Sequence, residues 1–358
     1  MEYTCVDAFT GAGGLLLGLQ KAGFKTILAF DNDPRCAETQ RLNPSYFHHE
    51  TVRSDVDDML NGGLLARIGM KRRELFLLAG GPPCQGFSLQ RIGKDQDKRN
   101  NLVFKFISLV EEVLPKYFLM ENVPGIEGRR GRAILAEALS EVARVGYSVH
   151  RKRLDAQDYG VPQRRKRVFV VGEERNHDDF SQFEFPKPTT PTGMRNTVRK
   201  AIGGLPAPPE NGTDHPEIRH HRRDLLSETN KRRLRVLKEG QGRDYLPQEL
   251  LTKSHHISSS KMGHRYVYGR MVWNDVAPTI TARFDSFTRG RFGHPDQLRT
   301  ISLREGALLQ SFPMDFTFAG NKVEIARQIG NAVPPLLAEA IGRAIIRSYQ
   351  AASERIVS

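Results

Sequence analysis

The segment Gly80-Gly81-Pro82-Pro83-Cys84-Gln85-Gly86-Phe87-Ser88 constrains this chain more than any other. The apolar run Leu75 to Ala79 before it predicts a buried strand. The two prolines end that strand and stiffen the turn, because each ring fixes φ and removes a backbone donor. The thiol of Cys84 therefore follows the carboxyl end of a strand, where open α/β sheets bind ligands. A structural cysteine in a tight turn is the alternative.

Short apolar strands alternate with amphipathic helices from residue 3 to residue 172. This alternation predicts an α/β fold with a doubly wound, mostly parallel sheet. We expect strands at Thr4–Phe9, Thr26–Phe30, Leu75–Ala79, Tyr117–Met120, Tyr147–Leu154 and Val168–Val171, and helices at Gly14–Ala22, Pro34–Leu42, Leu102–Leu114 and Arg132–Val145.

The character of the chain changes after Gly172, where prolines become frequent and long periodic segments are few. This pattern predicts a smaller, loop-rich domain with one short basic helix at Leu225–Lys238. Ser302 and Glu305 form a capping-box pattern that predicts a helix through about Ser311. A last helix is expected at Val333–Tyr349.

The formal charge of +13 indicates a polyanionic partner. Residues 175–298 hold 21 Lys and Arg against 14 Asp and Glu, which is about half of the excess. A solvated basic surface is the alternative. The three scattered cysteines favour neither a disulfide framework nor a metal site. We see no membrane-spanning stretch and no signal peptide, and expect a cytoplasmic protein.

Four further segments, taken with the Pro-Pro-Cys-Gln segment, carry a resemblance: Asp7 to Gly14, Glu121-Asn122-Val123, Gln163 to Arg167, and Gln328 to Pro335. In order and chemistry they resemble the DNA (cytosine-5) methyltransferases of bacterial restriction–modification systems. The resemblance runs from about residue 3 to about residue 345, except between roughly 175 and 275.

The resemblance implies a fold and a division of the chain. The fold is the S-adenosylmethionine-dependent methyltransferase sheet with a smaller, irregular target-recognition domain. Residues 1–173 would form the catalytic and cofactor-binding domain, and 174–298 the target-recognition domain. Residues 299–358 would return, their C-terminal helix packing on the catalytic domain.

The cofactor implied is S-adenosylmethionine. The glycine-rich turn after the first strand lacks the dinucleotide fingerprint, because position 16 is Leu. Asp33 before Pro34 is expected to cap a helix, which leaves Asp31 for the ribose hydroxyls. By resemblance the cofactor contacts are Phe9, Gly11, Gly13, Asp31, Asp55, Val56, Asn331 and Val333; Asp55 could instead belong to a solvated acidic loop.

The chemistry implied is covalent catalysis by Cys84, whose thiolate would add to C6 of cytosine and make C5 nucleophilic. Glu121 would protonate N3. Arg165 and Arg167 would support the flipped base and the surroundings of Cys84, with Arg167 nearer the base carbonyl. An ordinary basic strand edge is the alternative for this pair. Asn122 would order the backbone of the pocket.

The partner implied is double-stranded DNA, with the target base flipped out of the helix. Residues 89–101 suit a loop that closes over DNA, and the region of about 173–276 would read the sequence. Expected DNA contacts are Ser88, Arg91, Lys94, Arg99, Arg265, Tyr266, Tyr268, Arg270, Arg283, Arg289 and Arg291.

Three rival functions remain. A tRNA cytosine methyltransferase is disfavoured, because those relatives carry a Cys-Phe-Thr signature in the target region and no cysteine follows Cys84. A catalytically silent DNA-binding relative would not need Cys84, Glu121 and both arginines. A nicotinamide oxidoreductase explains neither Cys84 nor the basic region. The expectation is a monomeric, nucleoid-associated prokaryotic enzyme, with a cognate endonuclease as its possible partner and no metal.

Overall fold

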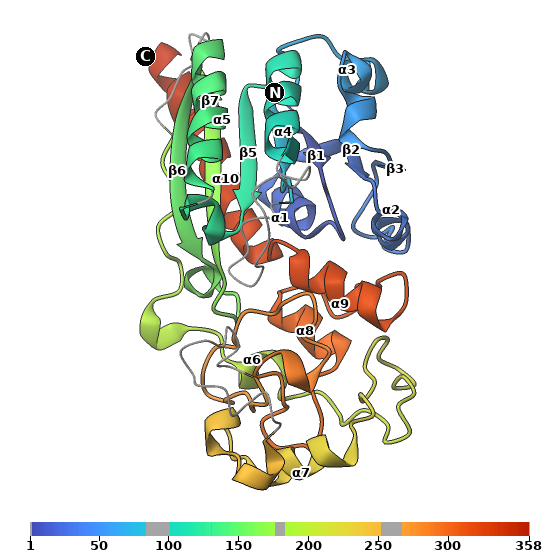
Figure 1. Cartoon of the computed structure of the whole chain (residues 1–358). Helices are drawn as coiled ribbons and strands as arrows, with labels where there is room; N and C mark the ends of the chain where they lie inside the picture. Colours follow the sequence, from blue (N-terminus) through green and yellow to red (C-terminus); the bar gives the residue numbers. More distant parts are fainter. Residues whose placement is uncertain (1, 84–100, 130, 176–182, 252–266, 358) are drawn as a thin grey trace. The chain divides into compact units, whose positions relative to one another are not determined.

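The computed structural model describes residues 2–83, 101–129, 131–175, 183–251 and 267–357 (Figure 1). It divides into two compact units. Unit 1 consists of residues 1–155, 166–189 and 333–358, and unit 2 of residues 156–165 and 190–332. The boundaries differ from those expected from the sequence. Residues 299–332 belong to the same unit as the irregular region, and unit 1 regains the chain only at Val333.

Unit 1 is built on one sheet with strand order β3-β2-β1-β4-β5-β7-β6. The first five strands in this order pair in parallel, and β7 runs antiparallel to both β5 and β6. The expected α/β fold is confirmed. The strands are β1 Thr4–Ala8, β2 Lys25–Asp31, β3 Glu50–Arg53, β4 Leu77–Gly80, β5 Tyr117–Asn122, β6 Tyr147–Asp155 and β7 Lys166–Glu174.

Helices cover both faces of this sheet (Figure 1). On one face Phe106 of α4 meets Phe118 of β5, with 6.4 Å between ring centroids. On the other face Tyr349 of α10 packs edge-on against Phe76 at 5.1 Å. The helices of unit 1 are α1 Gly14–Ala22, α2 Pro34–Arg41, α3 Gly63–Ile68, α4 Asn101–Val113, α5 Arg132–Val145 and α10 Pro335–Val357.

Helices α1 and α10 approach so closely that a Cβ on Gly18 would lie 2.3 Å from the carbonyl oxygen of Pro335. Only glycine fits at such a contact. The last helix therefore packs directly against α1, as the expected return of the chain to the catalytic domain requires.

Unit 2 has little regular structure, as its composition predicts. Its helices are α6 Val198–Ile202, α7 Glu228–Val236, α8 Leu303–Leu309 and α9 Lys322–Asn331. The predicted capping box is confirmed, because Ser302 accepts from the Glu305 N–H while the Glu305 carboxylate accepts from the Ser302 N–H. Leu234 of α7 belongs to a small core with Leu237, Leu246, Val267, Tyr268 and Phe287.

Candidate active site

The carboxyl ends of three neighbouring strands of unit 1 lie in one row. Ala8 of β1 pairs with Gly80 of β4, and Gly80 pairs with Met120 of β5. The next residues along the three strands are therefore Phe9, Gly81 and Glu121. The chain changes direction across the sheet between β1 and β4, which is the switch point where such sheets bind ligands.

Glu121 forms an ion pair at this edge. The Nε of Arg167, on β7, lies 2.9 Å from Oε1 of Glu121, and the two side chains are 12% and 11% exposed. Burial lowers the pKa of the Arg167 guanidinium, while the neighbouring Glu121 carboxylate opposes that shift. A buried ion pair of this kind holds both groups in one orientation.

Asn122 anchors the turn that leads to the cysteine. Its Nδ2 donates to the carbonyl oxygen of Pro82 at 3.0 Å, and its Oδ1 accepts from the Val123 N–H at 2.9 Å. A Cβ on Gly81 would stand 3.3 Å from Oε2 of Glu121. The turn therefore passes directly beside the carboxylate. Cys84 itself lies outside the described residues, as do Ser88, Arg91, Lys94, Arg99, Arg265 and Tyr266.

The turn after β1 has the backbone of a ligand-binding loop. Phe9 has a φ of 56°, although it is not glycine. Such strained residues are held by their surroundings and cluster at ligand sites. Gly11, at φ +55°, has open space where a Cβ would stand. A Cβ on Gly13 would lie 2.6 Å from the Phe47 ring, so this position requires glycine.

Asp31 ties that turn to the end of β2. Its Oδ2 accepts from the Gly11 N–H and its Oδ1 from the Asp33 N–H, both at 2.9 Å. A carboxylate accepts several hydrogen bonds, which is the chemistry that ribose hydroxyls require. Asp33 caps α2 through the Arg35 N–H, as predicted.

Asp55 and Val56 lie at the same edge, because the Ser54 N–H donates to the Asp31 carbonyl oxygen at 3.0 Å. Asp55 is exposed and caps a short 3-10 helix that begins at the buried Val56. Its carboxylate accepts from the Asp57 N–H. The remaining predicted cofactor residues fall in different units: Asn331 is exposed at the end of α9, and Val333 is buried in unit 1.

Arg165 does not fit the expected role beside the flipped base. Its side chain is fully buried in unit 2. It donates to the carbonyl oxygens of Ile280, Gly330 and Ala332 at 2.8 to 3.0 Å. A guanidinium that serves three carbonyls holds backbone segments together. We therefore reassign Arg165 to positioning the end of α9.

The comparisons identify the family. A family model for the C-5 cytosine-specific DNA methylases matches residues 3–347. This chain belongs to the C-5 cytosine-specific DNA methylases. The Type II methyltransferase M1.HphI of Haemophilus parahaemolyticus is 34% identical over 97% of this chain and 87% of its own length. The Type II methylase M.HgiDII of Herpetosiphon aurantiacus is also 34% identical, over 99% of this chain and 98% of its own.

Solved structures agree with the fold. A candidate DNA modification methyltransferase encoded within an E. coli prophage matches with a TM-score of 0.73 and 26% identity, over 98% of this chain and all of that one. The Dnmt2 methyltransferase of S. pombe matches with a TM-score of 0.64 at 16% identity, over 98% of this chain and all of its own, which shows the fold alone. The protein is therefore a DNA cytosine-5 methyltransferase with the α/β methyltransferase fold.

Two predicted DNA contacts of this methyltransferase are withdrawn. Arg270 is 5% exposed and donates to five backbone carbonyls of unit 2, including those of Leu234 and Leu237 at the end of α7. Tyr268 is 8% exposed, with the Arg233 guanidinium 4.5 Å from its ring centroid. Both residues hold the loops of unit 2 together.

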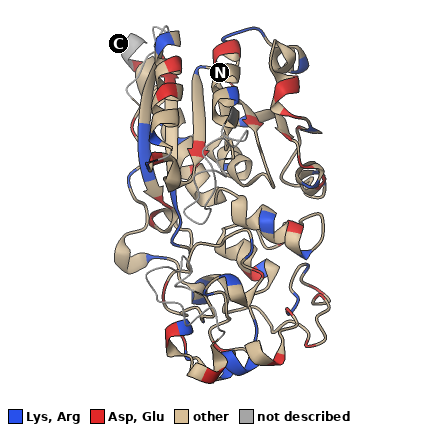
Figure 2. Ribbon diagram, viewed as in Figure 1, with Lys and Arg blue, Asp and Glu red and all other residues tan. Residues whose placement is uncertain are grey.

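Arg283 and Arg289 are exposed, as DNA contacts require. The Arg283 guanidinium also donates to Asp285. Arg291, the remaining predicted contact among the described residues, is partly buried. Figure 2 shows charges of both signs on α7, where Lys231 and Arg235 pair with Glu228. The basic character of this helix is therefore partly neutralised within the helix.

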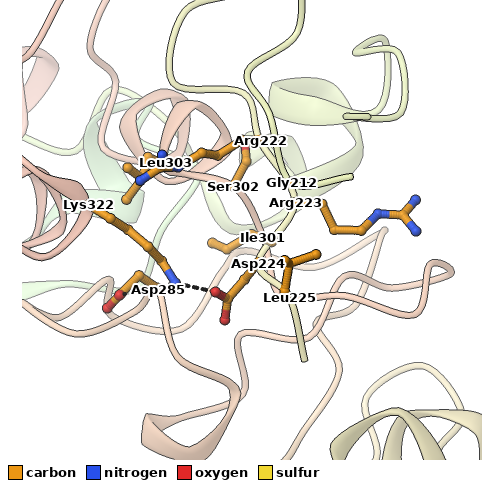
Figure 3. A pocket seen from close by; sticks show the side chains of 10 residues that line it. All are labelled: Gly212, Arg222, Arg223, Asp224, Leu225, Asp285, Ile301, Ser302, Leu303 and Lys322. Carbon is orange, nitrogen blue, oxygen red and sulfur yellow. Dashed lines mark hydrogen bonds and ion pairs between the residues drawn. The ribbon is translucent and has the colours of Figure 1, made fainter. Parts of the chain in front are cut away.

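A cavity of about 220 Å³ lies in unit 2 (Figure 3). Lys322, the first residue of α9, points to Asp224 across it and lies 3.6 Å from Asp285. Lys322 and the two aspartates pair with one another, so we interpret this group as fixing the start of α9 rather than as a ligand site.

The described residues contain no cluster of three or more His, Cys, Asp or Glu side chains suited to a metal. His221 is engaged by Ser302 and by the carbonyl oxygen of Pro206, and His220 accepts from the Phe318 N–H. Among the described residues, no helix combines the length and apolarity that crossing a membrane requires.

Proposed function

We propose that this enzyme transfers a methyl group from S-adenosylmethionine to C5 of one cytosine in a specific duplex site. The base would be flipped out of the helix and joined for a time to Cys84. The Glu121–Arg167 pair carries this proposal, because it stands beside the turn that leads to Cys84. A DNA base inside its stack cannot be reached by such a site, so flipping is required.

The residues of unit 1 fit the cofactor. The open space at Gly11 admits a ligand close to the backbone, and Asp31 places a carboxylate at the end of β2, where such folds bind ribose hydroxyls. Phe9 offers a ring at the same edge, and Asp55 offers a carboxylate to the adenine amino group. Val56 and Val333 supply apolar surface in unit 1, while Asn331 belongs to unit 2. S-adenosylmethionine supplies the electrophilic methyl group when it is bound.

Cys84 would act as the nucleophile. Its thiolate forms a bond to C6, and the electron pair of the C5–C6 double bond moves to C5. Glu121 delivers a proton to N3, so that the ring does not accumulate charge. C5 takes the methyl group with that electron pair, the methyl–sulfur bond breaks to release S-adenosylhomocysteine, and N3 returns its proton to Glu121. A base then removes the C5 proton, the double bond returns and the thiolate leaves; we assign no residue to the base.

Arg167 would hold Glu121 toward N3 and donate to the base carbonyl. Its guanidinium has more donors than the single bond to Glu121 uses. Asn122 would fix the approach of the Pro82-Pro83 turn. Arg165 would act only through the backbone segments that it holds.

Unit 1 would be the catalytic domain and unit 2 the target-recognition domain. Arg283 and Arg289 are the described residues that we propose as DNA contacts. Residues 89–101 would close over the duplex, with Arg91, Lys94, Arg99 and the preceding Ser88 contacting it, and Arg265 would read or bind DNA from unit 2. We further propose a monomer that resides on the nucleoid through DNA, with a cognate endonuclease acting on the same site.

Labelled methyl transfer tests the substrate. The enzyme is incubated with methyl-labelled S-adenosylmethionine and either unmethylated duplex DNA of random sequence or total tRNA. We expect label in DNA, at one short sequence read by bisulfite sequencing. Label in tRNA alone would replace the substrate assignment. DNA binding without label in either would favour the silent relative.

A further inference from the structure

A chain of buried hydrogen bonds runs beneath the turn after β1, and its centre is Gln40. This residue lies near the end of α2 and is 1% exposed. Its Nε2 donates to Thr10 Oγ1 at 3.0 Å and to the Gly11 carbonyl oxygen at 3.2 Å. Its Oε1 accepts from Thr51 Oγ1 at 2.9 Å, and His49 Nε2 lies 3.2 Å away.

The direction of every bond in this chain is determined. Gln40 uses both amide protons on the turn, so its oxygen must accept from Thr51 and His49. His49 then carries its proton on Nε2 and accepts at Nδ1, where Gln20 Nε2 lies at 3.5 Å. Burial lowers the pKa of His49 to about 4, which agrees with a neutral ring.

The chain ends on a carboxylate. Thr10 receives the proton of Gln40 on its hydroxyl oxygen and donates its own to Asp7 Oδ2 at 2.7 Å. Asp7 is fully buried in β1. Two aspartates therefore accept hydrogen bonds from the turn. Asp31 accepts from the Gly11 N–H, and Asp7 accepts from the Thr10 hydroxyl. Gln40 adds a further side-chain hydrogen bond by donating to the Gly11 carbonyl oxygen.

We propose that Gln40 is a positioning residue for cofactor binding, holding Thr10 and Gly11 of the turn in the conformation that receives S-adenosylmethionine. This inference rests on the proposed cofactor site. The two peptide groups that flank the Gly11 Cα are both held: the N–H of the first by Asp31 and the carbonyl oxygen of the second by Gln40. Releasing the carbonyl frees the turn in the protein without ligand, and ordering it again then costs binding affinity.

The test measures binding of S-adenosylhomocysteine by calorimetry, without DNA or turnover. Gln40→Met keeps the volume but removes two donors and an acceptor, and we expect at least about tenfold weaker binding. In steady-state assays, KM for S-adenosylmethionine should rise similarly, while kcat at saturation and KM for DNA stay within about twofold.

Two companion variants separate positioning from general stability. Thr51→Val removes one donor to Gln40 without touching the turn, and should weaken binding by roughly threefold. Combined with Gln40→Met it should add nothing, because both act through one group. Thr4→Val is the matched control: Thr4 Oγ1 accepts from the Phe76 N–H at the other end of β1. It should lower stability and leave binding unchanged.

The outcomes are distinct. The inference would be overturned if Gln40→Met bound S-adenosylhomocysteine within twofold of the unsubstituted protein. It would also be overturned if Thr4→Val, at the same stability as Gln40→Met, lost as much affinity. If the unsubstituted protein binds neither S-adenosylhomocysteine nor S-adenosylmethionine, the proposed cofactor itself is wrong, and this inference fails with it.

Discussion

Arg167 Nε lies 2.9 Å from Glu121 Oε1, and the two residues come from adjacent antiparallel strands. Glu121 pairs with Phe169 in the ladder, two residues beyond Arg167. The ion pair therefore spans the strands diagonally and is fixed by their register. A change in either side chain changes the orientation of the other, so the two should behave as one unit in catalysis.

Glu121→Gln and Arg167→Met test this unity. Each should lower kcat by roughly a hundredfold or more, since a positioned acid contributes about that much. The double variant should lose much less than the product of the two losses, because the pair acts together. Single-turnover methylation at saturating DNA measures all three. Fully multiplicative losses would contradict a shared role.

Arg165→Lys tests the reassignment of Arg165. An ammonium cannot serve the carbonyls of Ile280, Gly330 and Ala332 in the geometry that the guanidinium provides. We expect the free energy of unfolding to fall by about 3 kcal/mol, as for other buried charges that lose partners. Denaturant titration measures this. Full stability with lost turnover would restore Arg165 to the base pocket.

Asp7→Asn should change how stability depends on pH. Burial raises the pKa of Asp7 to about 7, with the hydrogen bond from Thr10 opposing the shift and Asp31 adding to it. The folded protein thus holds this proton more tightly than the unfolded chain does. The contribution of Asp7 is full below about pH 4 and is lost as pH rises to about 7.

Asparagine cannot ionise, so the variant should gain stability relative to the unsubstituted protein across that interval. The gain should reach a few kcal/mol, since one pKa unit is about 1.4 kcal/mol. The measurement should compare the free energies of unfolding of the two proteins at each pH, because His49 changes stability in the opposite direction. The stabilisation from neutral His49 is lost as pH falls from 6.5 to about 4 in both proteins and cancels in the comparison. A flat difference between pH 4 and 8 would contradict the prediction.

The buried pair Arg299–Glu305 and the exposed pair Arg35–Glu38 should respond very differently. The first is bidentate at 2.7 Å, with both side chains 1% exposed. Arg299→Met leaves a buried carboxylate without its partner and should cost about 3 to 5 kcal/mol. Arg35→Met, at 42% exposure, should cost under about 1 kcal/mol. Equal costs in denaturant titration would refute the contrast.

The sequence predicted the elements of unit 1 where periodicity was strong. Helices Gly14–Ala22 and Arg132–Val145 have the predicted bounds. It missed β3, whose four residues Glu50–Arg53 are polar or half-exposed and show no apolar run. It also missed α9, whose capping residue Asn321 with Glu324 was a readable signal.

The errors in the site concern side chains rather than motifs. A basic pattern cannot distinguish an arginine that faces DNA from one that ties carbonyls together, and Arg165 and Arg270 are of the second kind. The sequence contained only a weak signal for Gln40. It continues the buried face of α2 formed by Cys36 and Ala37, a polar residue where an apolar one is expected.

The central claim is best tested by covalent trapping on duplex DNA that carries 5-fluorocytosine in random sequence, with S-adenosylmethionine present. Fluorine at C5 cannot be removed as a proton is, so the enzyme should stall joined to the base. The account predicts a denaturant-resistant adduct on duplex DNA that maps to Cys84 and is absent in Cys84→Ser. An adduct on tRNA alone, or an adduct that persists in Cys84→Ser, would contradict it.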